Sequence, residues 1–575
     1  MKLGRYGLCG LVGLLTVMLI ASGCSWRGGG EPQHQTLSGT WIIAEDVNDP
    51  SARSESNVYY EIFVRAFADS DGDGIGDLRG VVNMLDYLND GDPETTEDLG
   101  VSGIWLMPIH PSPSYHGYDV TDYRSIHPDY GTLEDFQVLI EEAHKRGMKV
   151  IMDLVVNHTS SEHPWFLEAA MDPSSPYRDW YVWRDEEDSP IAVSAAGGPA
   201  WHRSPGGGAD YLGVFWSGMP DLNFDHAAVR REMIDIGKFW LELGVDGFRL
   251  DAAKHIYEDL SGDEKNPALQ ERNLAWWKEF REALQEVNPD VYLVGEVWDS
   301  SPARVAPYFQ VFDSAFNFTV GELAISAAAR EEDSNLAFTL ERMHGAYDTA
   351  SGGGFIDAPF LTNHDQNRVM SNLRGDLNHA KMAASILLTL PGRPFVYYGE
   401  EIGMQGVKPD EEIREPMKWA DEEGGTSAAG EGVPSLAGIP VSAYAEAMTR
   451  WRMPRHQADT PSVLAQQSDP ASLLHHYRAL IQLRSRLPVL VSGTILQLDL
   501  EPAQLMAYER RDGADRVLVV HNLGGSEAEA ILKPDAAGTA YERLVAASSS
   551  DVEVSSGEEG QLHLKLPPYS TAVVR

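Results

Sequence analysis

Short apolar runs rich in β-branched and aromatic residues alternate with longer amphipathic stretches along most of this chain. From Val58 onward the apolar runs include GIWLMPI, KVIMDLVVNH, DGFRLDA, VYLVGEVW, FIDAPFLTNHD and PFVYYG, with helical stretches such as EDFQVLIEEAHKRG and REMIDIGKFWLELG between them. This alternation predicts parallel strands joined by helices, and the continuous apolar character of the runs indicates strands buried on both faces. The units are numerous enough for a (β/α)8 TIM barrel.

Two interruptions and a change of period divide the chain into domains. A stretch dense in Trp, Pro, Gly and Asp follows the third strand and is too long for a connecting loop, which predicts an inserted small domain over residues 158–225. The barrel is then expected at residues 57–157 and 226–488, interrupted again by a low-complexity stretch at about 421–470. Over residues 489–575 short alternating strands predict a C-terminal antiparallel β-sandwich domain.

The first 24 residues have the pattern of a secretory signal. Lys2 and Arg5 precede an apolar run over residues 6–20, and small residues then lead to Cys24. The run is shorter than the about 20 apolar residues that a membrane-spanning helix needs. Its end resembles a bacterial lipoprotein cleavage site, which would make Cys24 the lipid-bearing N-terminus. Ala21 stands where leucine is more common, so simple secretion is the alternative.

Residues 25–56 are rich in Gly, Gln, Ser and Asp, which predicts a flexible tether after the anchor. The protein is therefore expected to be extracytoplasmic, either lipid-anchored to the cell envelope or secreted, with no membrane contact apart from the lipid. The one other cysteine, Cys9, lies within the signal. After cleavage neither an internal disulfide nor a thiolate metal site can form.

The charge of the chain excludes some classes of partner. Its formal net charge is −42, from 87 acidic and 45 basic residues. Such a surface repels nucleic acid and anionic lipid, so nucleic-acid binding is not expected. We interpret the charge as a solvated acidic surface that keeps the protein soluble, and we expect a monomer.

Four of the predicted strands end in polar clusters, at the position where barrel proteins carry their catalytic groups. The clusters are Asp153–His158, Gly247–His255, Gly295–Trp298 and Phe360–Asp365. In this order they resemble the signature segments of the α-amylase family, glycoside hydrolase family 13, and of its group intermediate between α-amylases and oligo-1,6-glucosidases. Two further stretches, His116–Tyr123 and Met219–Phe224, also look like family segments. The resemblance extends from Val58 to the C-terminus.

The resemblance implies a retaining hydrolase that acts through a covalent glycosyl-enzyme intermediate. This chemistry needs one carboxylate to attack the anomeric carbon and a second, protonated one to donate to the leaving oxygen, about 5 Å away. By family position these are Asp251 and Glu296, and Asp365 is the third carboxylate, which holds sugar hydroxyls. Arg249 and Asp251 point the same way along a strand, so this cation would keep the nucleophile ionised. Burial of Glu296 would raise its pKa and retain its proton.

The family position also implies residues that bind the sugar. His158 and His364 would bind hydroxyls of the reacting ring, and Tyr118 would stack on its apolar face. Lys254 and His255 resemble residues of endo-acting α-amylases that touch the leaving-group side. Arg249 is the remaining residue of the predicted substrate-binding set. Four other aromatic side chains are candidate sugar platforms, although each suits core packing equally well: Trp201, Trp216, Tyr257 and Trp298.

The stretch DSDGDGIGD places carboxylates at alternate positions, with glycines that permit a tight wrap. Such oxygen ligands suit a hard cation, but the loop is not an EF-hand because Gly80 stands at the twelfth position. Similar loops in the family bind calcium, which implies the ligands Asp69, Asp71, Asp73, Asp77 and the Ile75 carbonyl. A second calcium site at Asn157 and the His255 carbonyl is an open alternative whose carboxylate, from the inserted domain, the sequence does not identify.

Local residues favour endo-hydrolysis of α-1,4-glucans, with starch, glycogen and maltooligosaccharides as substrates. The segment MPDLN looks intermediate between the amylase and oligo-1,6-glucosidase versions, so an α-glucosidase, cyclomaltodextrinase or glucan transglycosylase is the alternative. A non-catalytic carbohydrate-binding protein would be expected to lose one of the three carboxylates. The sequence contains neither an H-E-x-x-H cluster nor a glycine loop with G-K-S or G-K-T, which argues against metallohydrolase and nucleotide chemistry.

Overall fold

The computed structural model describes residues 34–36, 40–47, 54–184, 198–257, 267–420, 435–436, 439–440, 454–533 and 541–575. The predicted signal, with Cys24, and residues 25–33 lie outside these ranges. In the described part of the chain, no helix combines the length and the apolar character that crossing a membrane requires.

Eight parallel strands form the predicted barrel, in the order in which they occur along the chain. They are β3 (Tyr59–Ile62), β4 (Gly103–Leu106), β5 (Lys149–Leu154), β9 (Gly247–Leu250), β10 (Tyr292–Gly295), β11 (Ser314–Asn317), β12 (Ile356–Pro359) and β13 (Phe395–Tyr397). The last strand pairs with the first, and a parallel bridge between Phe360 and Phe395 joins it to β12. The barrel prediction is confirmed.

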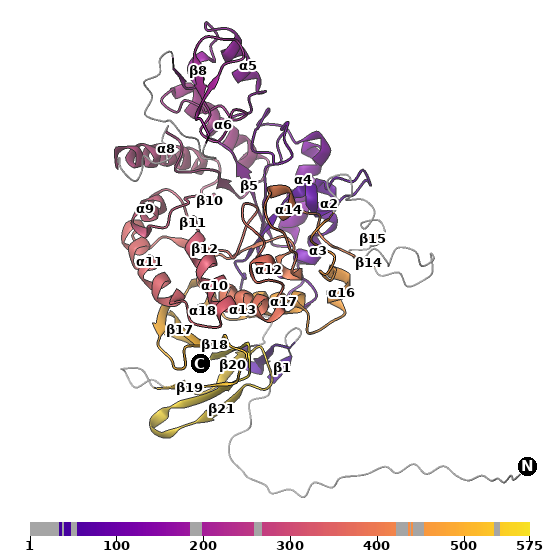
Figure 1. Cartoon of the computed structure of the whole chain (residues 1–575), viewed down its shortest axis with the longest axis vertical. Coiled ribbons are helices and arrows are strands. Elements are labelled where there is room, and N and C mark those ends of the chain that lie inside the picture. Colours follow the sequence, from indigo (N-terminus) through magenta and orange to yellow (C-terminus); the bar gives the residue numbers. More distant parts are fainter. Residues whose placement is uncertain are drawn as a thin grey trace, which may run out of the picture. The chain divides into compact units, whose positions relative to one another are not determined.

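The strands are apolar because both of their faces are buried. One face fills the barrel interior with a cluster that includes Tyr59, Trp105, Phe316 and Phe395. The other face packs against the helices, which lie outside the strands (Figure 1). Because large aromatic rings fill the barrel interior, it is a packed core, and the polar groups of the site lie at the ends of the strands.

The helices that connect and cover the strands follow the predicted amphipathic stretches. In α4 (Leu133–Lys145), Thr132 and Asp135 form a reciprocal capping box, and in α17 (Leu473–Arg486) the Ser472 hydroxyl caps the first turn. The others are α1 (Val64–Phe67), α2 (Leu78–Asn83), α3 (Leu85–Leu88), α6 (Ala227–Glu242), α8 (Pro267–Gln285), α9 (Pro302–Val305), α10 (Phe318–Arg330), α11 (Leu336–Ser351), α12 (Val369–Asn372), α13 (Leu377–Thr389), α14 (Asp410–Ile413), α16 (Val463–Gln467) and α18 (Val489–Ser492).

Between β5 and α6 the chain forms the small structure that the sequence predicts as an insertion. It contains α5 (Pro164–Met171) and a three-stranded antiparallel sheet of β6 (Trp183–Arg184), β8 (Asp210–Leu212) and β7 (Trp201–Arg203), in that order. A short core of Ala200, Leu212 and Val214 lies beneath the sheet. The segment returns to the barrel where Leu222 donates its N–H to the carbonyl of Asn157.

The C-terminal part forms two antiparallel sheets. Strands β20 (Leu544–Ala547), β23 (Ser570–Val574), β18 (Asp515–Asn522), β17 (Leu505–Asp512) and β16 (Thr494–Leu498) belong to one sheet, and β19 (Ala528–Leu532), β22 (Leu562–Leu566) and β21 (Glu553–Ser556) form the other. Alternate residues from both sheets share one core, including Leu518 and Leu564. This arrangement is the predicted sandwich.

The segment predicted as a tether, residues 25–56, departs from that prediction in its described part. Strands β1 (His34–Thr36) and β2 (Ile42–Ala44) add to the edge of the C-terminal sheet, where β2 pairs with β20. Trp41 is fully buried, and its indole N–H donates to Nδ1 of His476 over 3.1 Å. The short apolar patch at Trp41–Ala44 therefore ties this stretch to the folded protein.

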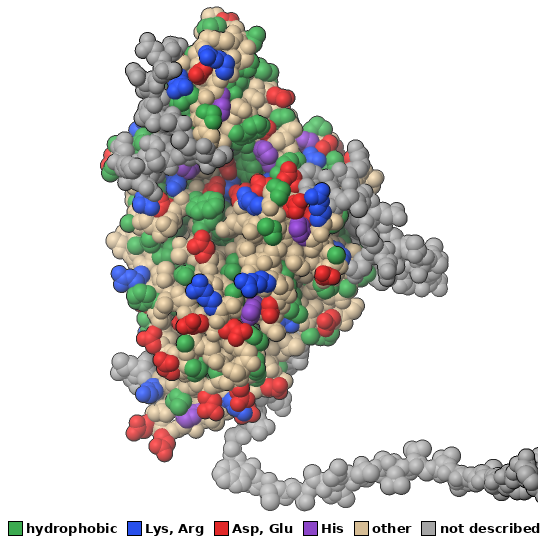
Figure 2. Space-filling model, viewed as in Figure 1, with side chains coloured by type: hydrophobic (Ala, Val, Ile, Leu, Met, Phe, Trp, Pro, Cys, Tyr) green, Lys and Arg blue, Asp and Glu red, His purple; other side chains and the backbone are tan. Residues whose placement is uncertain are grey.

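Acidic side chains are spread over the visible face of the molecule, with Lys and Arg between them (Figure 2). No single basic area interrupts this face. The picture agrees with the interpretation of the negative charge as a solvated surface.

Candidate active site

The polar clusters predicted at strand ends meet at the carboxyl ends of the barrel strands. Asp153 lies in β5 and Arg249 in β9, and the two are paired in register across these neighbouring strands. Asp251 follows β9 directly, and Glu296 follows β10. Because parallel strands of a barrel all present their carboxyl ends on one face, these four groups come together.

The guanidinium of Arg249 lies at the centre of the cluster. Its Nη1 donates to Oδ1 of Asp153 over 3.0 Å and to Oδ1 of Asp251 over 2.5 Å, and its Nη2 donates to Oε2 of Glu296 over 2.8 Å. Arg249 is buried, and the ring of Trp105 lies 5.4 Å from its Cζ. One buried cation thus holds the predicted nucleophile and the predicted acid side by side.

The environment acts differently on the two carboxyl groups. Burial raises the pKa of Glu296, the Arg249 guanidinium lowers it, and the neighbouring Asp251 and Asp365 raise it further, so the pKa of Glu296 stays above its usual range. Burial also raises the pKa of Asp251, although Arg249 favours its ionised form through charge and a hydrogen bond. The direction predicted for Glu296 is therefore found, whereas for Asp251 the cation only partly offsets burial.

Asp365 has the opposite electrostatic surroundings. Its Oδ1 accepts from Nη2 of Arg414 over 3.0 Å, and its Oδ2 lies 3.3 Å from Nε2 of His364. Burial opposes ionisation, but His364, Arg414 and Arg249 together hold the pKa of Asp365 well below its usual range. Asp365 is thus an ionised carboxylate, whereas the pKa values of its neighbours Asp251 and Glu296 are raised.

Tyr118 and His364 lie beside this carboxylate and contact each other. Their rings are stacked with centroids 5.6 Å apart, and the Tyr118 hydroxyl lies 2.7 Å from Nε2 of His364 and donates to Oδ2 of Asp153 over 3.0 Å. His158 lies behind them, with Nε2 donating to the Tyr118 carbonyl over 3.1 Å. Burial lowers the pKa of His158 to about 4, so this imidazole is neutral.

The residues predicted on the leaving-group side lie next to the cluster. Lys254 donates from Nζ to the carbonyl of Trp298 over 2.6 Å, and the His255 ring meets Phe215 edge to face at 6.2 Å. Trp298 is 51% exposed and stacks on Phe318 with the ring planes 6° apart. An exposed ring held flat in this way suits an apolar sugar face.

The other candidate platforms divide into two kinds. Trp216 is 47% exposed, as a platform requires. Tyr257 and Trp201 are covered by the guanidinium groups of Arg272 and Arg184, at 4.1 and 4.8 Å from the ring centres. These two rings are therefore engaged within the protein.

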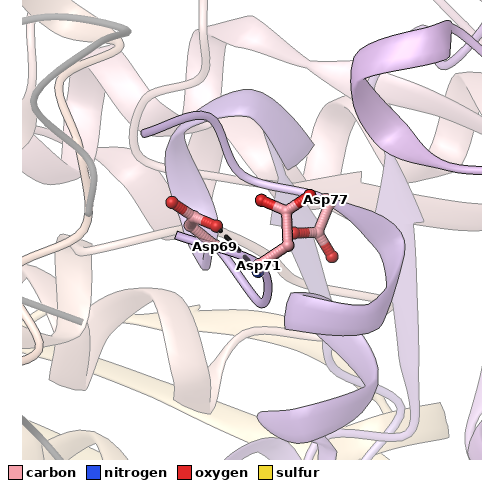
Figure 3. Close-up of side chains that lie close together, drawn as sticks. All are labelled: Asp69, Asp71 and Asp77. Carbon is pink, nitrogen blue, oxygen red and sulfur yellow. Dashed lines mark hydrogen bonds between the residues drawn. The ribbon is translucent and has the colours of Figure 1, made fainter. Parts of the chain in front are cut away.

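The acidic loop before α2 brings three of its predicted calcium ligands together. One carboxylate oxygen from each of Asp69, Asp71 and Asp77 lies within 4.8 Å of the others (Figure 3). Asp73 is outside this group, and its Oδ1 accepts the N–H of Ile75 over 2.9 Å. Clustered carboxylate oxygens are the donor set that a hard cation prefers, so the residues present fit calcium.

The structure also identifies a carboxylate beside the predicted second calcium site. Oδ1 of Asp221, from the inserted segment, lies 3.2 Å from Nδ2 of Asn157. Asp221 belongs to MPDLN, a segment singled out in the sequence for a different reason. The pairing of Leu222 with Asn157 is what brings this carboxylate to the strand end.

Asp153 and Arg414 are charged residues of the site that were not among those predicted. Asp153 opens the DLVVNH cluster, and an aspartate inside an otherwise apolar strand was the available signal. Arg414 follows α14 and is separated from Asp365 by 49 positions, with no local motif to mark it. A contact between such distant segments depends on the fold.

A parallel eight-stranded barrel whose strand ends carry a cluster of carboxylates around one cation has the architecture of a glycoside hydrolase. Residues 61–493 match the family description "Alpha amylase, catalytic domain", and residues 505–573 match "Alpha-amylase SusG C-terminal domain". The chain belongs to the α-amylase family, glycoside hydrolase family 13.

Known relatives agree on the family and differ in activity. The chain is 44% identical to Alpha-amylase 3 of Dictyoglomus thermophilum, over 82% of this chain and 85% of that protein. It is 33% identical to an oligo-1,6-glucosidase of Parageobacillus thermoglucosidasius, over 81% of this chain and 89% of the relative. The crystal structure of an α-amylase from H. orenii superposes with a TM-score of 0.78 at 46% identity, covering 90% of this chain and 98% of the other.

Proposed function

We propose that this protein hydrolyses α-1,4-glucosidic bonds within starch, glycogen and maltooligosaccharides with retention of configuration. The observation that carries the proposal is the buried guanidinium of Arg249, which donates to both Asp251 and Glu296. Two carboxyl groups on one planar cation have the close spacing that a covalent glycosyl-enzyme mechanism needs, rather than the wider spacing that admits an attacking water.

In this mechanism Glu296 donates its proton to the glycosidic oxygen while the carboxylate of Asp251 attacks the anomeric carbon. The leaving chain departs with a new hydroxyl, and the sugar is held as an ester of Asp251. Glu296, now ionised, then removes a proton from water, whose oxygen attacks the anomeric carbon and releases Asp251. Asp365, ionised throughout, stabilises the positive charge that develops on the sugar ring.

The endo-acting specificity is supported by Lys254 and His255, which follow the nucleophile in the chain, with Lys254 in contact with the exposed Trp298. The likeness to an α-amylase at 44% identity points the same way. The alternative is an α-glucosidase, cyclomaltodextrinase or glucan transglycosylase acting with the same three carboxylates. It is favoured by the MPDLN segment and by the likeness to an oligo-1,6-glucosidase.

Product analysis separates these activities. Incubation with starch and maltoheptaose should yield short maltooligosaccharides, and NMR of the first products should show the α-anomer. Cleavage of isomaltose or sucrose with starch left intact would overturn the amylase proposal, and the β-anomer as first product would overturn retention.

Calcium bound by Asp69, Asp71 and Asp77 is a second part of the proposal, supported by the convergence of their oxygens. The ion would lock the loop before α2. At a calcium concentration of about 100 times Kd, binding would stabilise the fold by about 2.7 kcal/mol.

Removal of calcium should therefore lower the melting temperature, and re-addition should restore it. Asp71→Asn should blunt this response, whereas Asp92→Asn, in a separate exposed acidic turn, should keep it. An identical melting temperature with and without chelator would contradict the calcium site.

We also propose that Cys24 carries a lipid that attaches the protein to the outside of a bacterial membrane. The proposal is supported by the basic residues, apolar run and small residues that precede Cys24. Metabolic labelling with a tagged fatty acid should mark the wild type and not Cys24→Ser. Labelling of neither protein, with both found in the medium, would favour simple secretion.

A further inference from the structure

A buried glutamate from the first barrel strand contacts the active site without belonging to the predicted set. Glu61 lies in β3, and its side chain is almost entirely buried. Its Oε1 is 2.5 Å from Nδ1 of His364, which is itself fully buried at the end of β12. An ionised carboxylate only accepts hydrogen bonds, so Nδ1 of His364 carries the proton of this contact.

The second ring nitrogen of His364 also faces oxygens that accept. Nε2 lies 2.7 Å from the Tyr118 hydroxyl and 3.3 Å from Oδ2 of Asp365. The Tyr118 hydroxyl directs its own proton to Asp153, so its oxygen is left to accept from His364. Both ring nitrogens therefore act as donors, which requires the imidazolium form.

The charges around the ring favour this form. The ionisable groups whose charges face His364, from its own loop and from the neighbouring elements, are Glu61, Tyr118, Asp153, Asp251, Asp365 and Arg414. Burial by itself would lower the pKa of His364, but the carboxylates of Asp365 and Glu61 outweigh burial and raise it to about 9. The guanidinium of Arg414 donates to the backbone carbonyl of His364.

We propose that Glu61 is a positioning residue that holds His364 as a cationic double donor, with Nε2–H facing the edge formed by the Tyr118 hydroxyl and Oδ2 of Asp365. A single sugar hydroxyl placed there accepts a hydrogen bond from Nε2–H of His364 and donates one to the carboxylate of Asp365. Recognition thus requires a hydroxyl, which both gives and accepts, on the ring that reacts. The assignment rests on the proposed glycosidase function and adds to it the group that sets the charge of the histidine.

The test compares Glu61→Gln with Glu401→Gln. The glutamine keeps the shape of Glu61 and an acceptor oxygen but removes its charge. Glu401 is an equally buried glutamate, which accepts from the hydroxyls of Tyr60 and Tyr87 and has no contact with His364. Melting curves of both variants establish that they are folded.

Two readouts are expected to separate the variants. In Glu61→Gln the rate constant kcat should fall about 10–100-fold, as when a residue that orients a functional histidine is lost, while Glu401→Gln should change little. By NMR with histidine labelled in the ring, the pH at which His364 titrates should fall by about 1–3 units in Glu61→Gln, with the signal assigned by its loss in His364→Gln. In Glu61→Asp the shorter carboxylate should restore most of the titration shift.

A His364 titration that is unchanged in Glu61→Gln would overturn the proposal even if activity fell, because the loss would then be structural. Unchanged activity would overturn it as well. The NMR measurement needs no substrate, so it stands if the wild type proves to cleave another glycosidic linkage. In that case the proposed substrate specificity fails and the role of Glu61 is tested on the substrate that is cleaved.

Discussion

Buried arginines lie at both ends of the barrel strands, and the groups to which they donate differ in kind. At the carboxyl ends, Arg249 donates to the carboxyl groups of Asp153, Asp251 and Glu296. Before the amino ends, Arg484 and Arg510 donate to backbone carbonyls alone. Among the described contacts of these two residues there is no carboxylate.

The partners determine what burial does to each guanidinium. Burial lowers the pKa of Arg484 to about 9 and moves that of Arg510 down as well, because carbonyl oxygens supply hydrogen bonds without a full negative charge. For Arg249 the same burial is outweighed by Asp153, Glu296 and Asp251, and its pKa is raised. Buried arginines therefore have two different roles: Arg484 and Arg510 hold backbone segments together, whereas Arg249 is the electrostatic centre of the site.

Arg510 connects the C-terminal sandwich to the barrel, and Arg484 joins segments within the barrel. Arg510, in β17, donates to the carbonyl of Thr389 at the end of α13, where Tyr508 also contacts the Thr389 hydroxyl. Arg484 donates hydrogen bonds to the carbonyls of Ser56 and Gly392, which precede β3 and β13. Cations at a helix C-terminus and at buried carbonyls just before strands satisfy groups that no regular structure pairs.

The largest effect should follow from changing the partners of Arg249. Glu296→Gln should lower kcat/KM by about 10²–10⁴-fold, and Asp251→Asn by at least as much. Both substitutions keep side-chain shape, so circular dichroism and starch binding should be retained. Loss of folding together with activity would show that these carboxyl groups serve stability, as the backbone carbonyls bound by Arg484 and Arg510 do.

The next largest effect should be on stability at the amino ends. Arg510→Met leaves buried carbonyls without donors and should lower the apparent free energy of unfolding by about 3 kcal/mol. The rate per folded molecule should stay the same. Arg543→Met, which removes a partly exposed pair with Asp46, is the matched control and should cost less than about 1 kcal/mol in denaturant titrations.

A substantial loss of kcat in folded Arg510→Met would contradict a purely structural role of Arg510, because it would make this residue part of the catalytic machinery. An unfolding midpoint equal to that of the control would show that the buried hydrogen bonds of Arg510 stabilise the fold no more than an exposed ion pair does.

A smaller, pH-dependent effect distinguishes the catalytic end. The pKa of Glu296 is raised in the folded chain, so the unfolded chain, with an ordinary pKa of about 4.3, loses this proton first as pH rises. The wild type should therefore lose stability between about pH 4.3 and the folded pKa of Glu296, by about 1.4 kcal/mol for each unit of the shift. Glu296→Gln has no proton to lose at this position.

The measurement is the melting temperature of wild type and Glu296→Gln over this pH range. The melting temperature of the variant should rise relative to that of the wild type as pH rises. A constant difference between them would mean that the carboxyl group of Glu296 is as solvated as one at the surface.

The sequence predicted the features that repeat or lie close together in the chain. The alternation of apolar runs and amphipathic stretches was sufficient for the barrel, and the local clusters located Asp251, Glu296 and His364 at strand ends. Their direction toward a common centre followed from the geometry of parallel strands. The position of Glu296 at the end of an apolar strand also predicted that its side chain is largely covered, and it is 15% exposed.

The features that escaped prediction depend on contacts between distant segments. Glu61 and Arg414 touch His364 and Asp365 across 303 and 49 positions. The strand at Ile42–Ala44 exists because an edge of the C-terminal sheet is available to it, about 500 positions later. A stretch of three apolar residues has no period from which such a pairing could be inferred.

The central claim is that Asp251 attacks the sugar while Arg249 holds it beside Glu296. A maltosyl fluoride whose ring carries an additional fluorine, added to Glu296→Gln, should form the ester and hydrolyse it slowly, because fluorine destabilises the second transition state and the general base is missing. Mass spectrometry of the digested protein should find the maltosyl group on Asp251. Attachment to Asp153 or Asp365, or the absence of any adduct while the wild type yields inverted products, would contradict the account.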